Sequence, residues 1–138
     1  MTDTKPAGEA VNCFVCGPAN PIGLKMQFSL DDGVCVGHFT PQDHHCGFDG
    51  VTHGGIVFAV LDDVMANWLF LQDKRGYTAR CDVRYRQPLP TGTAVRAEAR
   101  LVSSKRNLYV LDGQLKREDT DALVAQCTAR FMVTANAT

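Results

Sequence analysis

The sequence predicts an α+β domain in which one long buried helix packs against an antiparallel sheet. Residues 54–72 are almost all apolar, and a helix that is apolar on nearly all sides is either buried or membrane-spanning. Segments that alternate apolar and charged residues lie beyond it, and this period of two is typical of half-buried strands. The expected order is two strands, the helix and four further strands, which is an α+β arrangement.

The N-terminal region and the overall composition suit one soluble domain. The chain has 138 residues, a net charge of −1 and a pI near 6.4, so nothing points globally to nucleic acid or to an anionic membrane. Residues 1–12 are polar and lack the apolar core of a signal peptide. We expect them to form a flexible arm ahead of one domain over residues 13–138, in a cytoplasmic protein.

The six cysteines do not predict a disulfide framework, because no export signal is present. Three of them fall in strand-like segments and are expected to be small buried hydrophobic residues: Cys35, Cys81 and Cys127. Cys13 and Cys16 have the spacing of half a zinc site, which His44, His45 and Cys46 could complete, but one such pair is a weak signal. A redox pair has less support, since no strand precedes it and no evident helix follows. We therefore expect no metal and no cofactor.

The central helix is expected over residues 54–72, after a hairpin. Residues 24–30 and 34–40 are predicted strands, because Asp31-Asp32-Gly33 between them is a tight-turn sequence. Between Ile56 and Leu71 the only clearly polar residues are Asp62, Asp63 and Asn67. A membrane span needs about 20 predominantly apolar residues, so this shorter segment with two central aspartates is expected to be buried.

Four strands are predicted after the helix, each bounded by turn-forming residues. They cover residues 77–86, 95–101, 108–116 and 122–133. The connections contain Pro88 to Gly92, Ser103 to Asn107 and Glu118 to Asp121, which are typical turn compositions.

The residues around the start of the helix have the types and spacing of catalytic groups. His53 precedes Gly54 and Gly55, and Asp62 follows the histidine by nine positions. The glycines leave the first backbone N–H groups unobstructed at the positive end of the helix dipole. Such groups can stabilise a carbonyl oxygen as it becomes an oxyanion, while a carboxylate activates water or attacks directly. An ionised aspartate is costly to bury unless it is paired, so this segment is a candidate active site.

Structural explanations compete with these roles. Asp62 could pair with a loop N–H, but its apolar neighbours favour catalysis. Asp63 is better explained structurally, through Asn67 or a subunit interface. His53 by itself would more often be a core histidine, and a loop role and a pocket role are equally open for His45.

The motifs Gly50-x-x-His53-Gly54-Gly55 with Asp62, and Tyr85-x-x-Pro88 after the helix, are shared with a known family. With the order of elements, they resemble the hot-dog fold, in which a sheet wraps around one long central helix. More narrowly, the chain resembles the phenylacetate-pathway type of acyl-CoA thioesterase over nearly its whole length after Asn12. The opening segment from Cys13 to Leu24 also resembles bacterial members.

The resemblance implies roles for matching residues. Asp62 would be the general base or the nucleophile, and the N–H of Gly54, with that of Gly55, would polarise the thioester carbonyl. His53 would shape the pocket, and Thr78, donated by a partner subunit, would help to position water. Relatives carry Asn or Gln where this chain has Gly47, and His45 is the candidate to occupy that space.

The implied function is hydrolysis of an acyl-CoA thioester to a carboxylic acid and free coenzyme A. Lys105 and Arg106 would bind coenzyme A phosphates, and the acyl pocket would lie near Phe58, Met65 and Trp68. We expect a homodimer or homotetramer with sites shared between subunits, and no nucleic-acid or membrane partner. Two alternatives stay open: a hydratase or dehydratase acting on enoyl or 3-hydroxyacyl thioesters through His45, and a non-enzymatic acyl-CoA-binding protein.

Overall fold

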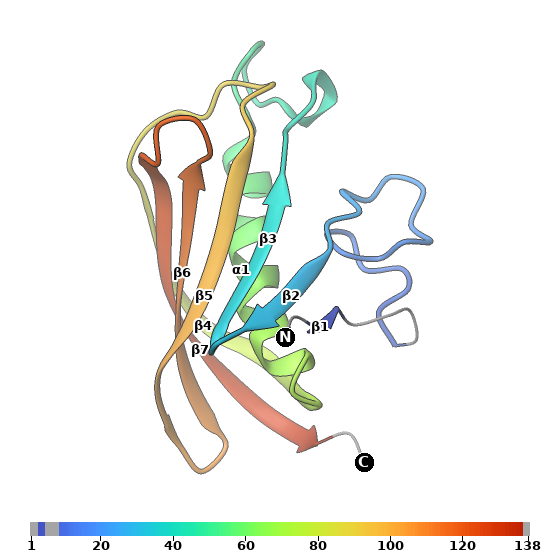
Figure 1. The fold of residues 1–138 in the computed structure, drawn as a ribbon, viewed down its shortest axis with the longest axis vertical. Coiled ribbons are helices and arrows are strands. Elements are labelled where there is room, and N and C mark those ends of the chain that lie inside the picture. Colours follow the sequence, from blue (N-terminus) through green and yellow to red (C-terminus); the bar gives the residue numbers. More distant parts are fainter. Residues whose placement is uncertain (1–2, 5–8, 137–138) are drawn as a thin grey trace.

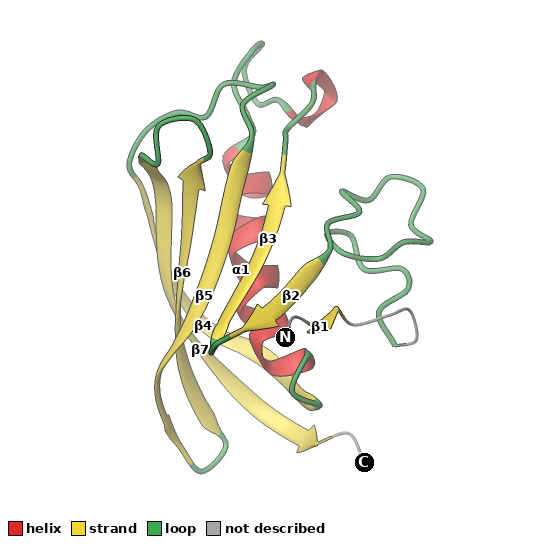
Figure 2. Ribbon diagram, in the orientation of Figure 1, coloured by secondary structure: helices red, strands yellow, loops and turns green. Residues whose placement is uncertain are grey.

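The computed structural model describes residues 3–4 and 9–136, and it has one long helix wrapped by an antiparallel sheet (Figures 1 and 2). The sheet order is β1-β2-β3-β5-β6-β7-β4. Its strands are β1 (Asp3–Thr4), β2 (Phe28–Asp31), β3 (Val34–Phe39), β4 (Lys74–Tyr85), β5 (Val95–Lys105), β6 (Leu108–Arg117) and β7 (Leu123–Asn136). The helix α1 (Gly54–Phe70) follows a short 3-10 helix, η1 (Asp43–His45). The predicted α+β order is confirmed.

The helix α1 is buried, as its apolar sequence predicts. Val60, Leu61, Val64 and Met65 are fully shielded from solvent, and no helix in the described residues is long and apolar enough to cross a membrane. The indole Nε1 of Trp68 donates to the Gly33 carbonyl oxygen at 2.9 Å and ties the end of α1 to the β2–β3 turn.

The first predicted strand is wrong at its start. Residues 24–27 do not pair in the sheet, because Lys25 has a φ of 56° and the chain there bonds to the N-terminal loop instead. The N–H groups of Leu24 and Met26 donate to the carbonyl oxygens of Phe14 and Val15. The turn predicted at residues 31–33 is confirmed, with positive φ angles at Asp32 and Gly33.

Two short elements were not predicted. Asp3–Thr4 of the expected flexible arm pairs with β2 as β1, while residues 1–2 and 5–8 lie outside the described residues. The 3-10 helix η1 lies in the loop before α1, where the sequence has no period long enough to indicate it.

Strand β4 forms one edge of the sheet. It pairs with β7 on one side and with no other strand of the described residues on the other side. Most of its side chains from Tyr77 to Tyr85 are exposed. A long exposed edge is a ready template for pairing with another chain, so β4 is the natural place for an interface.

The prediction that the strand cysteines are buried is confirmed for two of the three. Cys35 and Cys127 are buried, Cys81 is half-buried, and all six cysteines of the chain are free.

Candidate active site

The first turn of α1 leaves one backbone donor available. His53 has an extended backbone and caps the helix, because its ring Nδ1 accepts from the N–H of Gly55 at 2.8 Å. The His53 carbonyl oxygen accepts from Ile56 and Val57. Within the described chain the Gly54 N–H has no hydrogen-bond partner. The two glycines expected to act alike therefore differ: the Gly55 N–H is occupied by the cap, and the Gly54 N–H points outward from the positive end of the helix.

Tyr85 of β4 fixes this helix start from the side. Its hydroxyl donates to the Gly54 carbonyl oxygen at 2.9 Å. Gly54 and Tyr85 line a cavity of about 340 Å³, which Arg86 and Gln87 also border. Thr52 lies at the same cavity, and its buried Oγ1 has no hydrogen-bond partner among the described residues. The cavity therefore combines a free backbone donor, a hydroxyl group and a cation.

Asp62 lies on the same side of α1, where it meets Thr78 of β4. The Thr78 hydroxyl donates to Asp62 Oδ1 at 2.8 Å. Burial raises the pKa of the Asp62 carboxyl, and the hydrogen bond from Thr78 lowers it by a smaller amount. A carboxylate whose pKa lies above the ordinary range is a better proton acceptor, which suits a general base. The resemblance implied a Thr78 donated by a partner, but here Thr78 lies against the Asp62 of its own chain.

Gly54 and Asp62 share a face of α1 but cannot act on one carbonyl group within a single chain. Gly54, Phe58 and Asp62 are spaced by four residues, so they lie in one stripe along the helix. Eight residues separate Gly54 from Asp62 and place them about 12 Å apart along the axis. One chain therefore has an unpaired backbone donor at the start of the helix and a carboxylate about two turns further on.

His45 belongs to the loop that supports His53 rather than to the pair at Asp62. Its Nδ1 accepts from the Gln42 N–H at 2.9 Å, and its carbonyl oxygen accepts from the His53 N–H. Burial, followed by the neighbouring His44, lowers the pKa of the His45 ring and keeps it neutral. No hydrogen bond joins His45 to Asp62 in the described chain.

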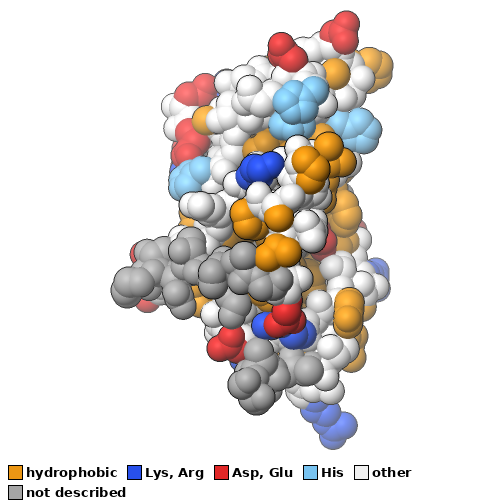
Figure 3. All heavy atoms as spheres, turned by 90° about the vertical axis from the view of Figure 1, so that its right-hand side faces the viewer, with side chains coloured by type: hydrophobic (Ala, Val, Ile, Leu, Met, Phe, Trp, Pro, Cys, Tyr) orange, Lys and Arg blue, Asp and Glu red, His pale blue; other side chains and the backbone are white. Residues whose placement is uncertain are grey.

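The histidine cavity is separate from the cavity beside Gly54. His38, His44 and His45 line a cavity of about 550 Å³, and Figure 3 shows histidine side chains gathered at the upper end of this face. The position of Gly47 faces His53, since a Cβ there would lie 3.4 Å from the His53 Cα. A side chain at this position would therefore contact His53, and His45 does not replace it.

Other predicted contacts lie away from the helix start. Met65, predicted to lie near the acyl pocket, is fully buried in the core against Gly113 of β6. Trp68 is also buried and bonded to the β2–β3 turn. Phe58 is half-buried on the stripe between Gly54 and Asp62, so it remains beside the candidate site.

The cations predicted for coenzyme A lie at the far end of the sheet. Lys105 ends β5 and Arg106 is in the following turn, at the end opposite the start of α1 in Figure 1. Strand β5 begins at Val95, after the loop that pairs with Val51 just ahead of the helix. From Val95 to Lys105 the strand covers about 33 Å. Within one chain, Arg86 is the cation beside Gly54.

Asp63 faces away from this site, as the structural explanation predicts. Its Oδ2 accepts from the Asn67 side chain at 3.1 Å, and its Oδ1 accepts from the Cys13 thiol at 3.5 Å. The contact with Asn67 could be predicted from the sequence, because the two residues are four apart on a helix. The contact with Cys13, which is 50 residues away, could not.

Several residues at the cavity were not predicted as site residues, among them Thr52, Tyr85 and Arg86. Tyr85 belongs to the motif Tyr85-x-x-Pro88, but nothing in the sequence shows that its hydroxyl reaches Gly54. Thr52 directly precedes His53, and only the three-dimensional packing shows its hydroxyl without a partner.

The comparisons with known proteins agree with this architecture. The family model described as Thioesterase superfamily matches residues 49–124, which include His53, Gly54, Asp62 and Thr78. No curated protein matches the chain significantly.

Solved structures have the same fold. The PaaI protein of the E. coli phenylacetic acid degradation operon has a TM-score of 0.76 at 19% identity, over 83% of both chains. The smu.793 protein of Streptococcus mutans UA159, bound to acetyl CoA, has a TM-score of 0.74 at 20% identity, over 80% of this chain and 91% of that one. A hypothetical thioesterase of Streptococcus pneumoniae TIGR4, with coenzyme A, has a TM-score of 0.73 at 19% identity, over 78% and 86%. The fold is the hot-dog fold, and the chain belongs to the thioesterase superfamily.

Proposed function

We propose that the protein hydrolyses acyl-CoA thioesters to a carboxylic acid and free coenzyme A. The observation that carries the proposal is the pairing of a buried carboxylate, Asp62, with the Thr78 hydroxyl on the same face of α1 as the unpaired Gly54 N–H. Coenzyme A and acetyl CoA are bound by two proteins of similar fold, and this supports an acyl-CoA substrate here.

The reaction needs a donor for the carbonyl oxygen and a base or nucleophile for the carbonyl carbon. The Gly54 N–H would hold the oxygen as it gains negative charge. Asp62 would take a proton from water while the water oxygen bonds to the carbon, or would itself attack to give an anhydride that water then opens. In both routes the carbon–sulfur bond breaks and coenzyme A leaves as a thiolate, which takes up a proton. Thr78 would hold Asp62 in place.

A symmetric dimer would bring the backbone donor and the carboxylate together. Because Gly54 and Asp62 are about 12 Å apart along one helix, we propose that Gly54 of one chain faces Asp62 of the other. The two-fold axis would then pass near Phe58, midway between them. Tyr85 and Thr78 contact these same two residues from β4, so antiparallel pairing of two β4 edges would align both.

The pneumococcal relative gives further support to a joint role of Asp62 and Thr78. Two of its variants have been crystallised, one with an aspartate and one with a threonine replaced by alanine, at positions that are 16 residues apart. Asp62 and Thr78 have the same separation.

The test is a hydrolysis screen over short, medium and aromatic acyl-CoAs, with detection of the released thiol. We expect turnover of at least one class of acyl-CoA. The turnover rate of an Asp62→Asn variant should be about 10²–10⁴-fold lower than that of the wild type. Asp32→Asn is the matched control, because Asp32 is exposed in a turn with a positive φ that asparagine also tolerates. Absence of turnover across the panel, or equal activity of both variants, would refute the proposal.

A further inference from the structure

The N-terminal loop holds two thiols in a fixed arrangement. In this cysteine loop (residues 10–17), the Gly17 N–H donates to the Cys13 carbonyl oxygen at 2.9 Å, and the Cys16 N–H donates to the Cys13 sulfur at 3.4 Å. A Cβ on Gly17 would lie 2.3 Å from the Cys13 nitrogen, so only glycine fits this turn. The loop is therefore rigidly folded, with both cysteines on one side.

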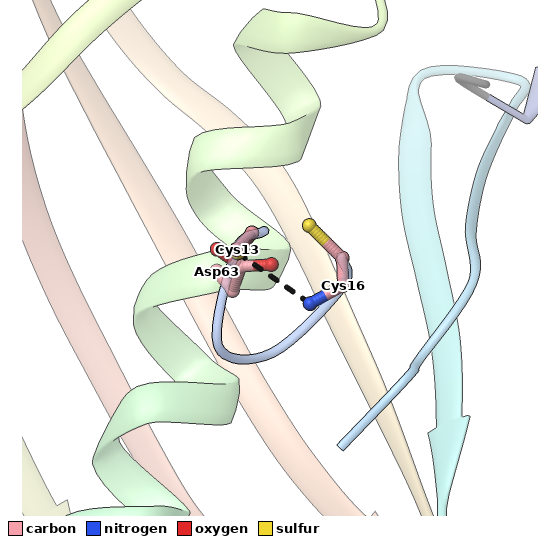
Figure 4. A group of neighbouring side chains, drawn as sticks. All are labelled: Cys13, Cys16 and Asp63. Carbon is pink, nitrogen blue, oxygen red and sulfur yellow. Dashed lines mark hydrogen bonds between the residues drawn. The ribbon is translucent and has the colours of Figure 1, made fainter. Parts of the chain in front are cut away.

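The cysteine loop lies against α1 at Asp63. Figure 4 shows the three side chains together, two from the loop and one from the helix. The two sulfur atoms and a carboxylate oxygen lie within 4.8 Å of one another, and Cys13 Sγ is 3.5 Å from Asp63 Oδ1. All three residues are partly buried. The segment is joined to the helix here by polar atoms that are also metal-ligand atoms.

These atoms have the spacing of zinc ligands. Zinc binds cysteine sulfur at about 2.3 Å and carboxylate oxygen at about 2.1 Å, so a tetrahedral site places a sulfur and an oxygen about 3.6 Å apart. The measured separation of 3.5 Å between Cys13 Sγ and Asp63 Oδ1 matches this value. The ligands found in space are not the ones that the sequence suggested, because His44 and His45 line a different cavity.

The surrounding groups orient these ligands. The side-chain amide of Asn67 donates to Asp63 Oδ2 at 3.1 Å, so Asp63 Oδ1 is left to face Cys13. The same Asn67 nitrogen lies 3.8 Å from the Cys16 sulfur. Outer-shell hydrogen bonds of this kind fix ligand orientation in metal sites. A cavity of about 200 Å³, lined by the three ligands and also by Lys74 and Arg75, opens beside them. Two thiolates and one carboxylate around a divalent ion give a net charge of −1, which Lys74 would offset, while Arg75 is paired with Glu9 at 2.6 Å.

We propose that Cys13, Cys16 and Asp63 bind one zinc ion, with the fourth position open to this cavity. Binding would release the two thiol protons to solvent, so affinity should weaken as the pH falls. The ion would attach the cysteine loop to α1 at the residue next to Asp62. A zinc ion with three protein ligands keeps an exchangeable fourth position, but it would take no part in the proposed hydrolysis, because Asp62 faces Thr78 and not the cluster.

Metal titration of the reduced, chelator-treated protein tests the site. We expect one Co²⁺ per chain, with a sulfur-to-cobalt charge-transfer absorption that Zn²⁺ abolishes by displacement. The absorption should be lost in Cys13→Ser and in Cys16→Ser. Cys46→Ser is the matched control, since Cys46 is partly buried but lies outside the cluster, and it should bind like the wild type.

Two further variants examine the carboxylate and its support. Asp63→Asn should lose the tetrahedral cobalt spectrum, and Asn67→Ala should bind Zn²⁺ about 10–100-fold more weakly. Circular dichroism shows which variants fold, and zinc should raise the melting temperature of the wild type but not of Cys13→Ser.

Three results would overturn the inference. The first is a reduced wild-type protein that takes up no Co²⁺ or Zn²⁺. The second is equal uptake by Cys13→Ser and Cys46→Ser. The third is a stable Cys13–Cys16 disulfide in the purified protein that, once reduced, still binds no metal, which would make the pair a redox couple. None of these results depends on thioester hydrolysis.

Discussion

Two opposing effects act on the pKa of the Asp62 carboxyl. Burial in the apolar face of α1 raises the pKa of its carboxyl, and the Thr78 hydroxyl lowers it by stabilising the ionised form. The balance leaves a carboxylate that accepts a proton more readily than an exposed one. In the proposed mechanism Thr78 therefore acts through Asp62, as a positioning residue.

Removing the Thr78 hydroxyl should change the pH dependence of hydrolysis. In Thr78→Val the lowering influence is lost, so the pKa of Asp62 should rise and the acid limb of kcat/KM should move to higher pH. Thr78→Ser keeps the hydroxyl and should keep the wild-type profile. A Thr78→Val profile that coincides with the wild type would show that the threonine only packs.

Asp62→Asn should not destabilise the fold at neutral pH. A carboxyl with a raised folded pKa binds more protons when folded than when unfolded, so its contribution to stability is lost as the pH rises through the folded pKa. The variant should be at least as stable as the wild type near about pH 7, and the difference should shrink as the pH falls toward the usual carboxyl pKa. Melting temperatures of both proteins across this range test it. A large loss of stability at neutral pH would mean that Asp62 is a structural residue.

The sequence identifies some of the candidate site residues and not others. Asp62 could be selected as a candidate, because an ionised carboxylate buried in an apolar helix is costly unless it has a partner or a function. The occupation of the Gly55 N–H by His53 could not, because it depends on the ring orientation. The full burial of Met65 against the sheet could not be predicted, because a uniformly apolar helix does not show which side faces the sheet.

At the scale of the element, the start of α1 is held by contacts from two sides. His53 caps it from the preceding loop, and Tyr85 binds the Gly54 carbonyl oxygen from β4. The existence of the helix and of the six strands after the N-terminal region followed from periodicity, but several strand ends did not. Strand β4 begins at Lys74 and not at Tyr77, and β7 ends at Asn136 and not at Val133. Strand β5 extends beyond its predicted end at Leu101 to Lys105, through a bulge between Leu101 and Ser103. Bulges interrupt the alternation on which such predictions depend.

Alanine substitutions at the two glycines should have different effects. A Cβ on Gly54 would lie 3.7 Å from the Tyr85 ring, so Gly54→Ala should fold, but its methyl group would obstruct a carbonyl approaching the N–H. We expect kcat/KM to fall by an amount that corresponds to a loss of about 2.7–4 kcal/mol of transition-state stabilisation, as for other oxyanion donors. A Cβ on Gly55 would lie 2.9 Å from the His53 ring, so Gly55→Ala should disturb the cap and also lower the melting temperature. A folded Gly54→Ala with unchanged kcat/KM would exclude the oxyanion role.

At the scale of the whole molecule, the edge strand β4 and the stripe on α1 point to one dimer. Phe58 lies midway between Gly54 and Asp62 and would meet its own copy at the two-fold axis. Phe58→Glu would bring two carboxylates together there, so it should give a monomer that folds but does not hydrolyse thioesters. Light scattering with circular dichroism measures both properties. A Phe58→Glu dimer of normal activity would place the interface elsewhere.

The proposed active site uses Gly54 from one chain and Asp62 from the other. Complementation between two inactive proteins, Asp62→Asn and Gly54→Ala, unfolded together and refolded, tests this arrangement. Half of the random dimers would be mixed, and each mixed dimer would hold one intact site, so activity should return to about one quarter of the wild-type value. A mixture whose activity stays at the mean of the two separate variants would contradict the shared site.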